Sequence, residues 1–298
     1  MYHRIMVPLD GSRFAESVLP VALAISRRTG APLHFVMVQE PIPSFAYDEW
    51  EDASREWAEG YLGSVTDRAS ERTEPDVTWK LLTGHVAESL ETEAEARDVD
   101  LVVMATHGRG MFSRAWLGSV TASFVHHTDR PVLLVRPGDG EAVDLDSDWA
   151  PSKVLIPLDG SDLSESATEH AVELGSLFSA AYHLVRVVPY PMDIASSYLP
   201  HTVQMNQGLV EEAKVVAGGY LDGQAAGLGA RDLQVTTGVL VDAQPGHGIL
   251  KEAEAQGCDF IAMATHGRSG LTRAILGSAS DKVLRGTHVP LLLHRPAL

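Results

Sequence analysis

The sequence has little cysteine: a single residue, Cys258, in 298. One cysteine cannot form an internal disulfide or supply the thiolate cluster of a structural zinc site. A disulfide-stabilised secreted domain is therefore excluded, and we expect Cys258 to pack in a core. The 13 histidines do not follow the spacing of a zinc motif either. We accordingly predict no metal site built from side chains.

Long apolar runs and an excess of positive charge are also missing. No stretch approaches the roughly 18 apolar residues that a membrane-spanning helix needs, and residues 1–8 lead into a strand-like run without the features of a signal peptide. We expect a cytoplasmic protein without membrane contact. The formal net charge of -17 argues against nucleic-acid binding, which requires a basic face. An anionic ligand would have to be held by backbone N–H groups or a helix N-terminus.

An internal repeat accounts for nearly the whole chain. The segment RIMVPLDGS at residues 4–12 returns as KVLIPLDGS at residues 153–161, an offset of 149 residues. The segment DLVVMATHGRGMFSRAWLGS at residues 100–119 returns as DFIAMATHGRSGLTRAILGS at residues 259–278, an offset of 159. We place the additional ten or so residues around Pro189 to Gly219, since surface loops absorb insertions at low cost.

Two domains follow from this repeat. We expect them at residues 1–140 and 150–298, joined by a linker rich in Asp and Gly from Gly138 to Ser152. Each contains continuous apolar runs separated by amphipathic stretches, which is typical of parallel strands covered on both faces by helices. The fold class is therefore α/β, with two tandem doubly wound sheets of five parallel strands and ligand sites at the carboxyl ends of the strands. In the first domain we predict strands at 5–8, 33–38, 78–82, 101–105 and 132–135, and helices at 16–29, 56–72, 87–97 and 119–128.

The strongest motif is a glycine-containing loop between a strand and a helix. Gly108 follows a strand, nine residues intervene, and Gly118-Ser119 opens a helix; the second copy has Gly267 and Gly277-Ser278 at the same spacing. Glycine allows a close approach of backbone to an anion, which the helix N-terminus then attracts. Tight packing and helix capping alone are the alternative explanation. The loop residues Arg109, Arg114, Arg268 and Arg273 either reach the same anion or face water.

A carboxylate follows the first strand of each copy. Asp10 and Asp159 emerge in the segment LDGS at the carboxyl edge of the sheet. There a carboxylate can accept hydrogen bonds from a ribose or a base, or reach a metal ion on a phosphate chain. The alternative is that the Asp-Gly-Ser turn only caps the following helix. The two roles are compatible.

These motifs resemble the universal stress protein family in its tandem two-domain form. The pattern A-x-x-G, nine residues, G-S is close to the nucleotide-binding signature G-x-x-G-x9-G-[ST] of that family. The resemblance implies an adenine nucleotide α-hydrolase-like (Rossmann-like) fold, with domains paired through their last strands about a pseudo-twofold axis, and further association of two chains as an open possibility. It also implies that ATP is bound, with Mg²⁺ carried on its phosphates. Carried over by position, the nucleotide-binding residues are Asp10, Val38, Gly108, Gly118, Ser119 and Val120, and again Asp159, Val187, Gly267, Gly277, Ser278 and Ala279.

The sequence departs from the family signature at its first glycine, which is Ala105 in one copy and Ala264 in the other. If that position required a positive φ, alanine would cost about 1 kcal/mol or more. Its place at the end of a strand favours an ordinary extended conformation instead. The loop before the third helix also differs, with Ala243 where the first copy has Gly84, so the two copies need not bind equally.

Three functions remain open. The leading hypothesis is an ATP-binding regulatory protein with little or no turnover. The first alternative is a protein-interaction module that has kept the fold and lost the nucleotide, with Ala105 and Ala264 as traces of that loss. The second is an enzyme, either a weak ATP hydrolase or an adenylyl-transferring relative, which the lack of an evident general base disfavours. His107 and His266 lie in the loops, but neither copy supplies an obvious nucleophile with a base partner within the motif. The aromatic residues Phe45, Tyr47, Trp50 and Trp57 would serve as a lid over adenine, a partner surface or a local core.

Overall fold

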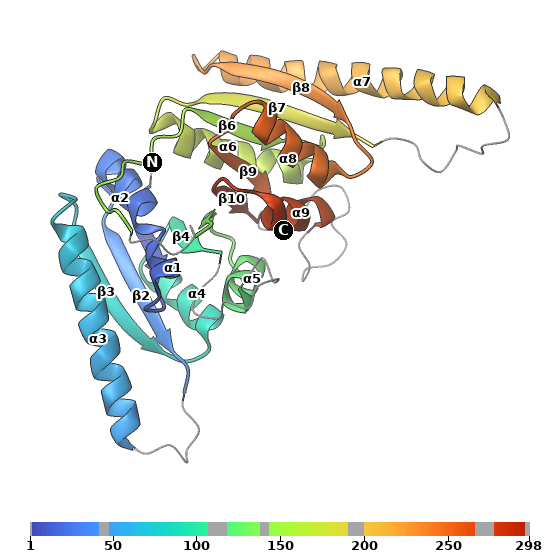
Figure 1. The fold of residues 1–298 in the computed structure, drawn as a ribbon. Helices are drawn as coiled ribbons and strands as arrows, with labels where there is room; N and C mark the ends of the chain where they lie inside the picture. The colour runs from blue at the N-terminus through green and yellow to red at the C-terminus, as the bar shows by residue number, and fades with distance from the viewer. Residues whose placement is uncertain are drawn as a thin grey trace. The chain divides into compact units, whose positions relative to one another are not determined.

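Short apolar runs form the strands of a parallel sheet in each half of the chain (Figure 1). The computed structural model describes residues 2–41, 48–106, 118–137, 143–189, 200–265 and 277–295. The chain divides into two compact units between Ala150 and Pro151. The elements of the first unit are β1 (Ile5–Pro8), α1 (Arg13–Glu16), α2 (Leu19–Thr29), β2 (Leu33–Gln39), α3 (Asp48–Ser70), β3 (Val77–Thr83), α4 (Val86–Ala96), β4 (Leu101–Ala105), α5 (Ser119–His127) and β5 (Val132–Val135).

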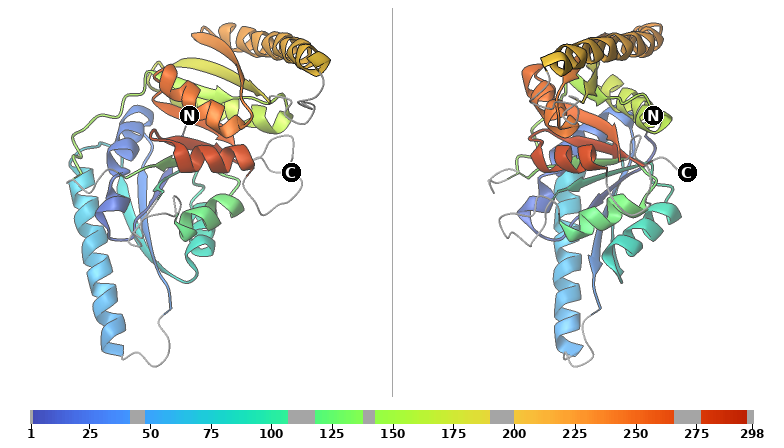
Figure 2. Two further views of the ribbon diagram at one scale, coloured as in Figure 1. Left: turned by 45° about the vertical axis from the view of Figure 1, so that its right-hand side comes forward. Right: turned by 90° about the vertical axis from the view of Figure 1, so that its right-hand side faces the viewer.

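The first unit is a doubly wound sheet with the strand order β3-β2-β1-β4-β5. Neighbouring strands run parallel, and Ile5 of β1 aligns with Leu33 of β2 on one side and Leu101 of β4 on the other. The middle strands are buried on both faces, as their continuous apolar sequences predict. Helices α2 and α3 cover one face, and α4 packs beside α5 on the other (Figure 2). The predicted fold class is thereby confirmed.

The elements of the second unit are β6 (Lys153–Pro157), α6 (Asp162–Ser176), β7 (Ala181–Val188), α7 (Pro200–Gly229), β8 (Val235–Val241), α8 (Pro245–Ala255), β9 (Phe260–Ala264), α9 (Ser278–Gly286) and β10 (Leu291–His294). They repeat the arrangement of the first unit, with the strand order β10-β9-β6-β7-β8. Helix α6 contacts β6, β9 and β10, helix α7 contacts β7 and β8, and α8 packs beside α9. The sole cysteine, Cys258, lies buried before β9, as expected, and burial raises its pKa to about 11.

The first helix differs from its prediction. A single helix over residues 16–29 was expected, whereas the structure has the short α1 and then α2, with a break at Ser17 and Val18. Pro20 explains the break, because proline has no N–H to donate and its ring collides with the carbonyl of the residue four positions earlier. The α6 helix has no such proline and runs without interruption from Asp162 to Ser176.

The extra residues of the second unit lie where the sequence comparison placed them. His34 and His183 occupy matching positions of β2 and β7 at an offset of 149 residues. Tyr61 and Tyr220, which lie beside the matching carboxylates Glu16 and Glu165, are 159 residues apart. The insertion of ten residues therefore falls between β7 and the middle of α7.

The end of the predicted linker is attached to the first unit. Leu145 is buried, and Asp148 forms ion pairs with Arg27 and Arg28 on α2. Hydrogen bonds from Arg28 hold the pKa of Asp148 below its usual range. Within the described ranges, no helix combines the length and the hydropathy needed to cross a bilayer.

Candidate functional site

Each unit has a cavity at the carboxyl ends of its strands. The first cavity, of about 290 Å³, is lined by the ends of β1, β2 and β4 and by the first residues of α4 and α5. The second, of about 740 Å³, is lined by the matching ends of β6, β7 and β9, the starts of α8 and α9, and one face of α7. In both units the cavity lies at the carboxyl end of the first strand, β1 or β6, where the connections to its two neighbouring strands run in opposite directions along the sheet. Doubly wound folds bind ligands at this point.

The aspartate after the first strand is held in the same turn in both units. Asp10 Oδ1 accepts hydrogen bonds from the Ser12 N–H at 2.9 Å and the Ser12 hydroxyl at 2.6 Å, and Asp159 Oδ1 accepts from Ser161 at 3.0 and 2.6 Å. The serine hydroxyl in turn caps the following helix. The intervening glycine, Gly11 or Gly160, has φ near +80°, which glycine adopts without strain.

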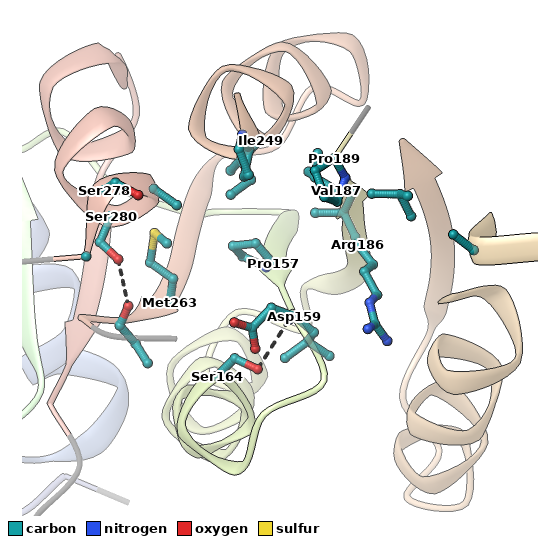
Figure 3. A pocket seen from close by; sticks show the side chains of 18 of the residues that line it. Pro157, Asp159, Ser164, Arg186, Val187, Pro189, Ile249, Met263, Ser278 and Ser280 are labelled. Carbon is teal, nitrogen blue, oxygen red and sulfur yellow. Dashed lines mark hydrogen bonds between the residues drawn. The ribbon is translucent and has the colours of Figure 1, made fainter. Parts of the chain in front are cut away.

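This geometry separates the two roles weighed for the aspartate. The serine is the residue that caps the helix, while the aspartate orders the turn and lines the cavity, as Asp10 does in the first unit and Asp159 in the second. Figure 3 shows Asp159 above α6, with its backbone N–H directed at the Ser164 hydroxyl at 3.3 Å. A carboxylate fixed in this way presents acceptor oxygens in a defined position.

The helix N-terminus predicted to hold an anion lies at the opposite side of each cavity. Gly118 and Gly277 are the N-caps of α5 and α9, and neither provides a side-chain cap. Each donates its own N–H to the threonine after the preceding strand, Gly118 to Thr106 and Gly277 to Thr265. The first N–H groups of any helix have no partner within the helix itself. Those of α5 and α9 border the cavity together with the hydroxyl of Ser119 or Ser278.

The remaining predicted contacts that the structure describes also line the two cavities. Val38 and Val187 project from the ends of β2 and β7, and Val120 and Ala279 lie in the first turns of α5 and α9. The structure thus brings together Asp10, Val38, Gly118, Ser119 and Val120 in one unit and Asp159, Val187, Gly277, Ser278 and Ala279 in the other. Gly108, Arg109, Gly267 and Arg268 lie outside the described residues.

The alanine that replaces the signature glycine is an ordinary strand residue. Ala105 aligns with Val135 of β5, Ala264 aligns with His294 of β10, and neither has a positive φ. Alanine therefore costs no backbone strain here, and the favoured explanation of this departure is confirmed. Both methyl groups line the cavity wall.

A hydroxyl contact that sequence reasoning missed joins this strand end to the helix. Thr121 donates from Oγ1 to the Ala105 carbonyl at 3.1 Å, and Ser280 donates from Oγ to the Ala264 carbonyl at 3.0 Å. Both side chains are buried. They fix the first turn of α5 and α9 against the strand that precedes the loop. The signal was a hydroxyl residue three positions after the second glycine in both copies.

A buried cluster fastens α4, whose first residues line the first cavity. His34 on β2 lies with Nε2 3.0 Å from Glu93 Oε1 and Nδ1 2.9 Å from the Thr78 hydroxyl, and Lys80 and Arg97 also donate to Glu93. Burial lowers the pKa of His34 and outweighs the opposing hydrogen bond to Glu93. Burial raises the pKa of Glu93, but hydrogen bonds from Lys80 and His34 prevail and hold it below its usual value.

The second unit builds the same contact with fewer charges. His183 Nε2 lies 2.9 Å from Glu252 Oε1 on α8, and Nδ1 lies 2.8 Å from the Thr236 hydroxyl. Gln256 donates to Glu252 where Arg97 does in the first unit. The cluster was not anticipated, although a histidine at the same place in the second strand of both copies was a signal that could have led to it.

Comparisons with known proteins place this geometry in a family. The sequence model of the universal stress protein family matches residues 1–136 and again residues 151–295. A universal stress protein of Mycobacterium tuberculosis is 32% identical over 202 residues, which is 67% of this chain and 63% of that protein. The chain therefore spans less than two thirds of the length of that relative. A universal stress protein of Methanocaldococcus jannaschii is 29% identical over 146 residues, which is 47% of this chain and 80% of that protein.

Solved structures share the fold over the whole chain. A universal stress protein from Archaeoglobus fulgidus superposes with a TM-score of 0.69, covering 99% of this chain and 96% of its own at 19% identity. A putative universal stress protein from Pseudomonas aeruginosa gives a TM-score of 0.64, covering 99% and 94% at 17% identity. At these identities the likeness concerns the fold. The two sequence-model matches, one to each half, show that this chain belongs to the universal stress protein family as a tandem of two such domains.

Proposed function

We propose that the protein binds an adenine nucleotide, ATP, in one or both units and acts as a regulatory protein with little or no turnover. One observation carries the proposal. In both units, a fixed carboxylate, a strand-end valine and a helix N-terminus that begins with glycine and serine border one cavity at the same edge of the sheet. Two units that have diverged in their middle segments keep this combination, which tight packing or capping alone does not require.

The cavity supplies what the two ends of a nucleotide need. The helix N-terminus at Gly277 and Ser278 offers backbone N–H groups and a hydroxyl to phosphate oxygens, aided by the positive end of the helix dipole. The Asp159 carboxylate would accept hydrogen bonds from the ribose or the base, and Val187 would contact the base. Asp10, Val38, Gly118 and Ser119 would act in the same way in the first unit.

Magnesium would be carried on the phosphates. In the part of the chain that the structure describes, no three His, Cys, Asp or Glu side chains come together as a metal site. Mg²⁺ keeps several waters and often takes substrate phosphates among its ligands, so it does not need such a cage. The aspartate oxygen Oδ1 already accepts two hydrogen bonds from the turn, which suits the binding of a ligand better than proton abstraction.

Isothermal titration of the nucleotide-stripped protein with Mg-ATP tests the proposal. Two sites per chain would mean that the alanines are tolerated and both units hold nucleotide, and one site would mean that the units have specialised. The absence of heat at several temperatures and millimolar ATP would overturn the proposal. That result would favour an interaction module, for which the exposed side chains of Trp50 and Trp57 on α3 would be the first surface to examine.

A further inference from the structure

The second cavity extends beyond its counterpart on the side of α7. Its additional lining includes Arg186 at the end of β7 and, on α7, Leu209, Glu212, Ala213 and Val216. None of the matching residues lines the first cavity among the residues described there. The residue that matches Arg186 is Met37, and counting back along the two helices from the matching Tyr61 and Tyr220 gives Trp50, Ala53, Ser54 and Trp57 on α3.

The lining residues on α7 form one wall of the second cavity, called the α7 wall below. Its apolar side chains are largely exposed to solvent. Leu209 is 47% and Val216 63% exposed, and both line the cavity seven residues apart, two turns along one face of α7. Branched apolar side chains that border a cavity and are open to solvent gain free energy when a ligand covers them. The wall is therefore suited to an apolar group.

The strand order fixes which end of a nucleotide would reach this wall. Along the sheet, β9 leads to the helix N-terminus at Ser278, β6 leads to Asp159, and β7 carries Arg186, while α7 contacts β7 and β8. In Figure 3, Pro157 and Asp159 lie between Ser278 and Arg186. With phosphates at α9, the α7 wall lies beyond the ribose, at the base.

The charges at the α7 end favour the same orientation. The charged residues of the described lining are Asp159, Arg186 and Glu212. The guanidinium of Arg186 lies 5.0 Å from the centre of the Tyr220 ring, and the Tyr220 hydroxyl donates to Glu165 at 2.7 Å. At the α7 end the charges of Arg186 and Glu212 balance, so this end offers phosphate no net positive charge, whereas the start of α9 attracts it.

This inference rests on the proposed function: we propose that the α7 wall determines which substituents on the base the second site accepts. Leu209 and Val216 cover the edge of the base, so this site accepts an adenine nucleotide with an apolar group on the base, whereas the first site does not. The first unit differs because none of the described residues of α3 lines its smaller cavity, and the buried Met37 stands in place of Arg186.

N6-benzyl-ATP is the probe that separates the two units. Titration would use two single-site proteins, Gly118→Val to leave the second site and Gly277→Val to leave the first. In the second site the benzyl group is expected to strengthen binding relative to ATP, by up to about tenfold if it is well covered. In the first site it is expected to weaken binding. Weaker binding of N6-benzyl-ATP than of ATP in the second site would overturn the inference.

The wall itself is tested in the Gly118→Val protein by Val216→Asn, with Val215→Asn as the matched control. Val215 is the neighbouring residue on α7, is 75% exposed and does not line the cavity. Val216→Asn is expected to weaken N6-benzyl-ATP about fivefold or more, and Val215→Asn to leave it unchanged. Equal effects of the two variants would refute the wall. If ATP bound neither unit of the wild-type protein, the proposed function would fail and this inference with it.

Discussion

Replacing the N-cap glycines by valine tests the phosphate site with little disturbance of the fold. Gly118 has φ -61° and ψ 145°, and Gly277 has φ -58° and ψ 147°. Any residue adopts these angles, so valine introduces no backbone strain. Valine caps a helix less well than glycine, which we expect to cost about 1 kcal/mol of stability. For a unit of this size, the melting temperature would then fall by a few degrees.

The expected loss of affinity is much larger than the loss of stability. A valine side chain beside the first N–H groups of the helix keeps a phosphate from approaching them. A hydrogen bond to a charged group contributes about 1.5 to 3 kcal/mol. Losing one such bond weakens binding by about 10- to 100-fold, since about 1.4 kcal/mol corresponds to a factor of ten. Gly118→Val should remove the first site alone, and Gly277→Val the second.

Titration with Mg-ATP measures both affinity and stoichiometry, and far-UV circular dichroism checks the fold. Each single variant serves as the control for the other, because the untouched unit should keep its affinity. Gly118→Ala and Gly277→Ala provide a graded test with a smaller side chain and an intermediate loss. A double valine variant that kept wild-type affinity and stoichiometry would refute the assignment of the phosphates to these helix starts.

Three further predictions concern stability and site geometry. His34 and Glu93 both have lowered pKa values in the folded protein, so the unfolded chain binds more protons and stability falls on acidification. We expect the thermal midpoint to decrease as pH falls through about 6.5 for His34 and again through about 4.5 for Glu93, which are the ordinary pKa values of these groups. The variant His34→Gln should flatten the first of these decreases. A midpoint that rises on acidification would contradict this prediction. Thr121→Val removes the buried hydrogen bond to the Ala105 carbonyl and should lower stability by about 1 to 3 kcal/mol, measured by urea unfolding, with no effect expected if the bond is dispensable. Gly160→Ala should cost about 1 to 3 kcal/mol because φ is +84° and the new Cβ would lie 3.0 Å from Arg186 Nη1; an unchanged unfolding midpoint would rule out strain in this turn.

The sequence alone determined the repeat, the fold class and most of the elements. Strands β1, β4 and β5 begin and end where they were predicted, because short apolar runs bounded by polar residues, glycine or proline leave little freedom in a sheet covered on both faces. The helix prediction over residues 16–29 was wrong at Ser17 because periodicity was given more weight than Pro20. The residues at the strand ends were also predictable, since parallel strands bring their carboxyl ends to one edge.

Only the tertiary structure decided how the two units differ. The contacts of His34 with Glu93 and of Arg186 with Tyr220 join residues 59 and 34 positions apart, on elements whose sequences do not reveal which faces meet. The size of each cavity depends on where the long helix packs, and the same helix face carries Trp57 in one unit and the cavity-lining Val216 in the other. Periodicity fixes which side of a helix is apolar, but the position of that side along the sheet is set by packing.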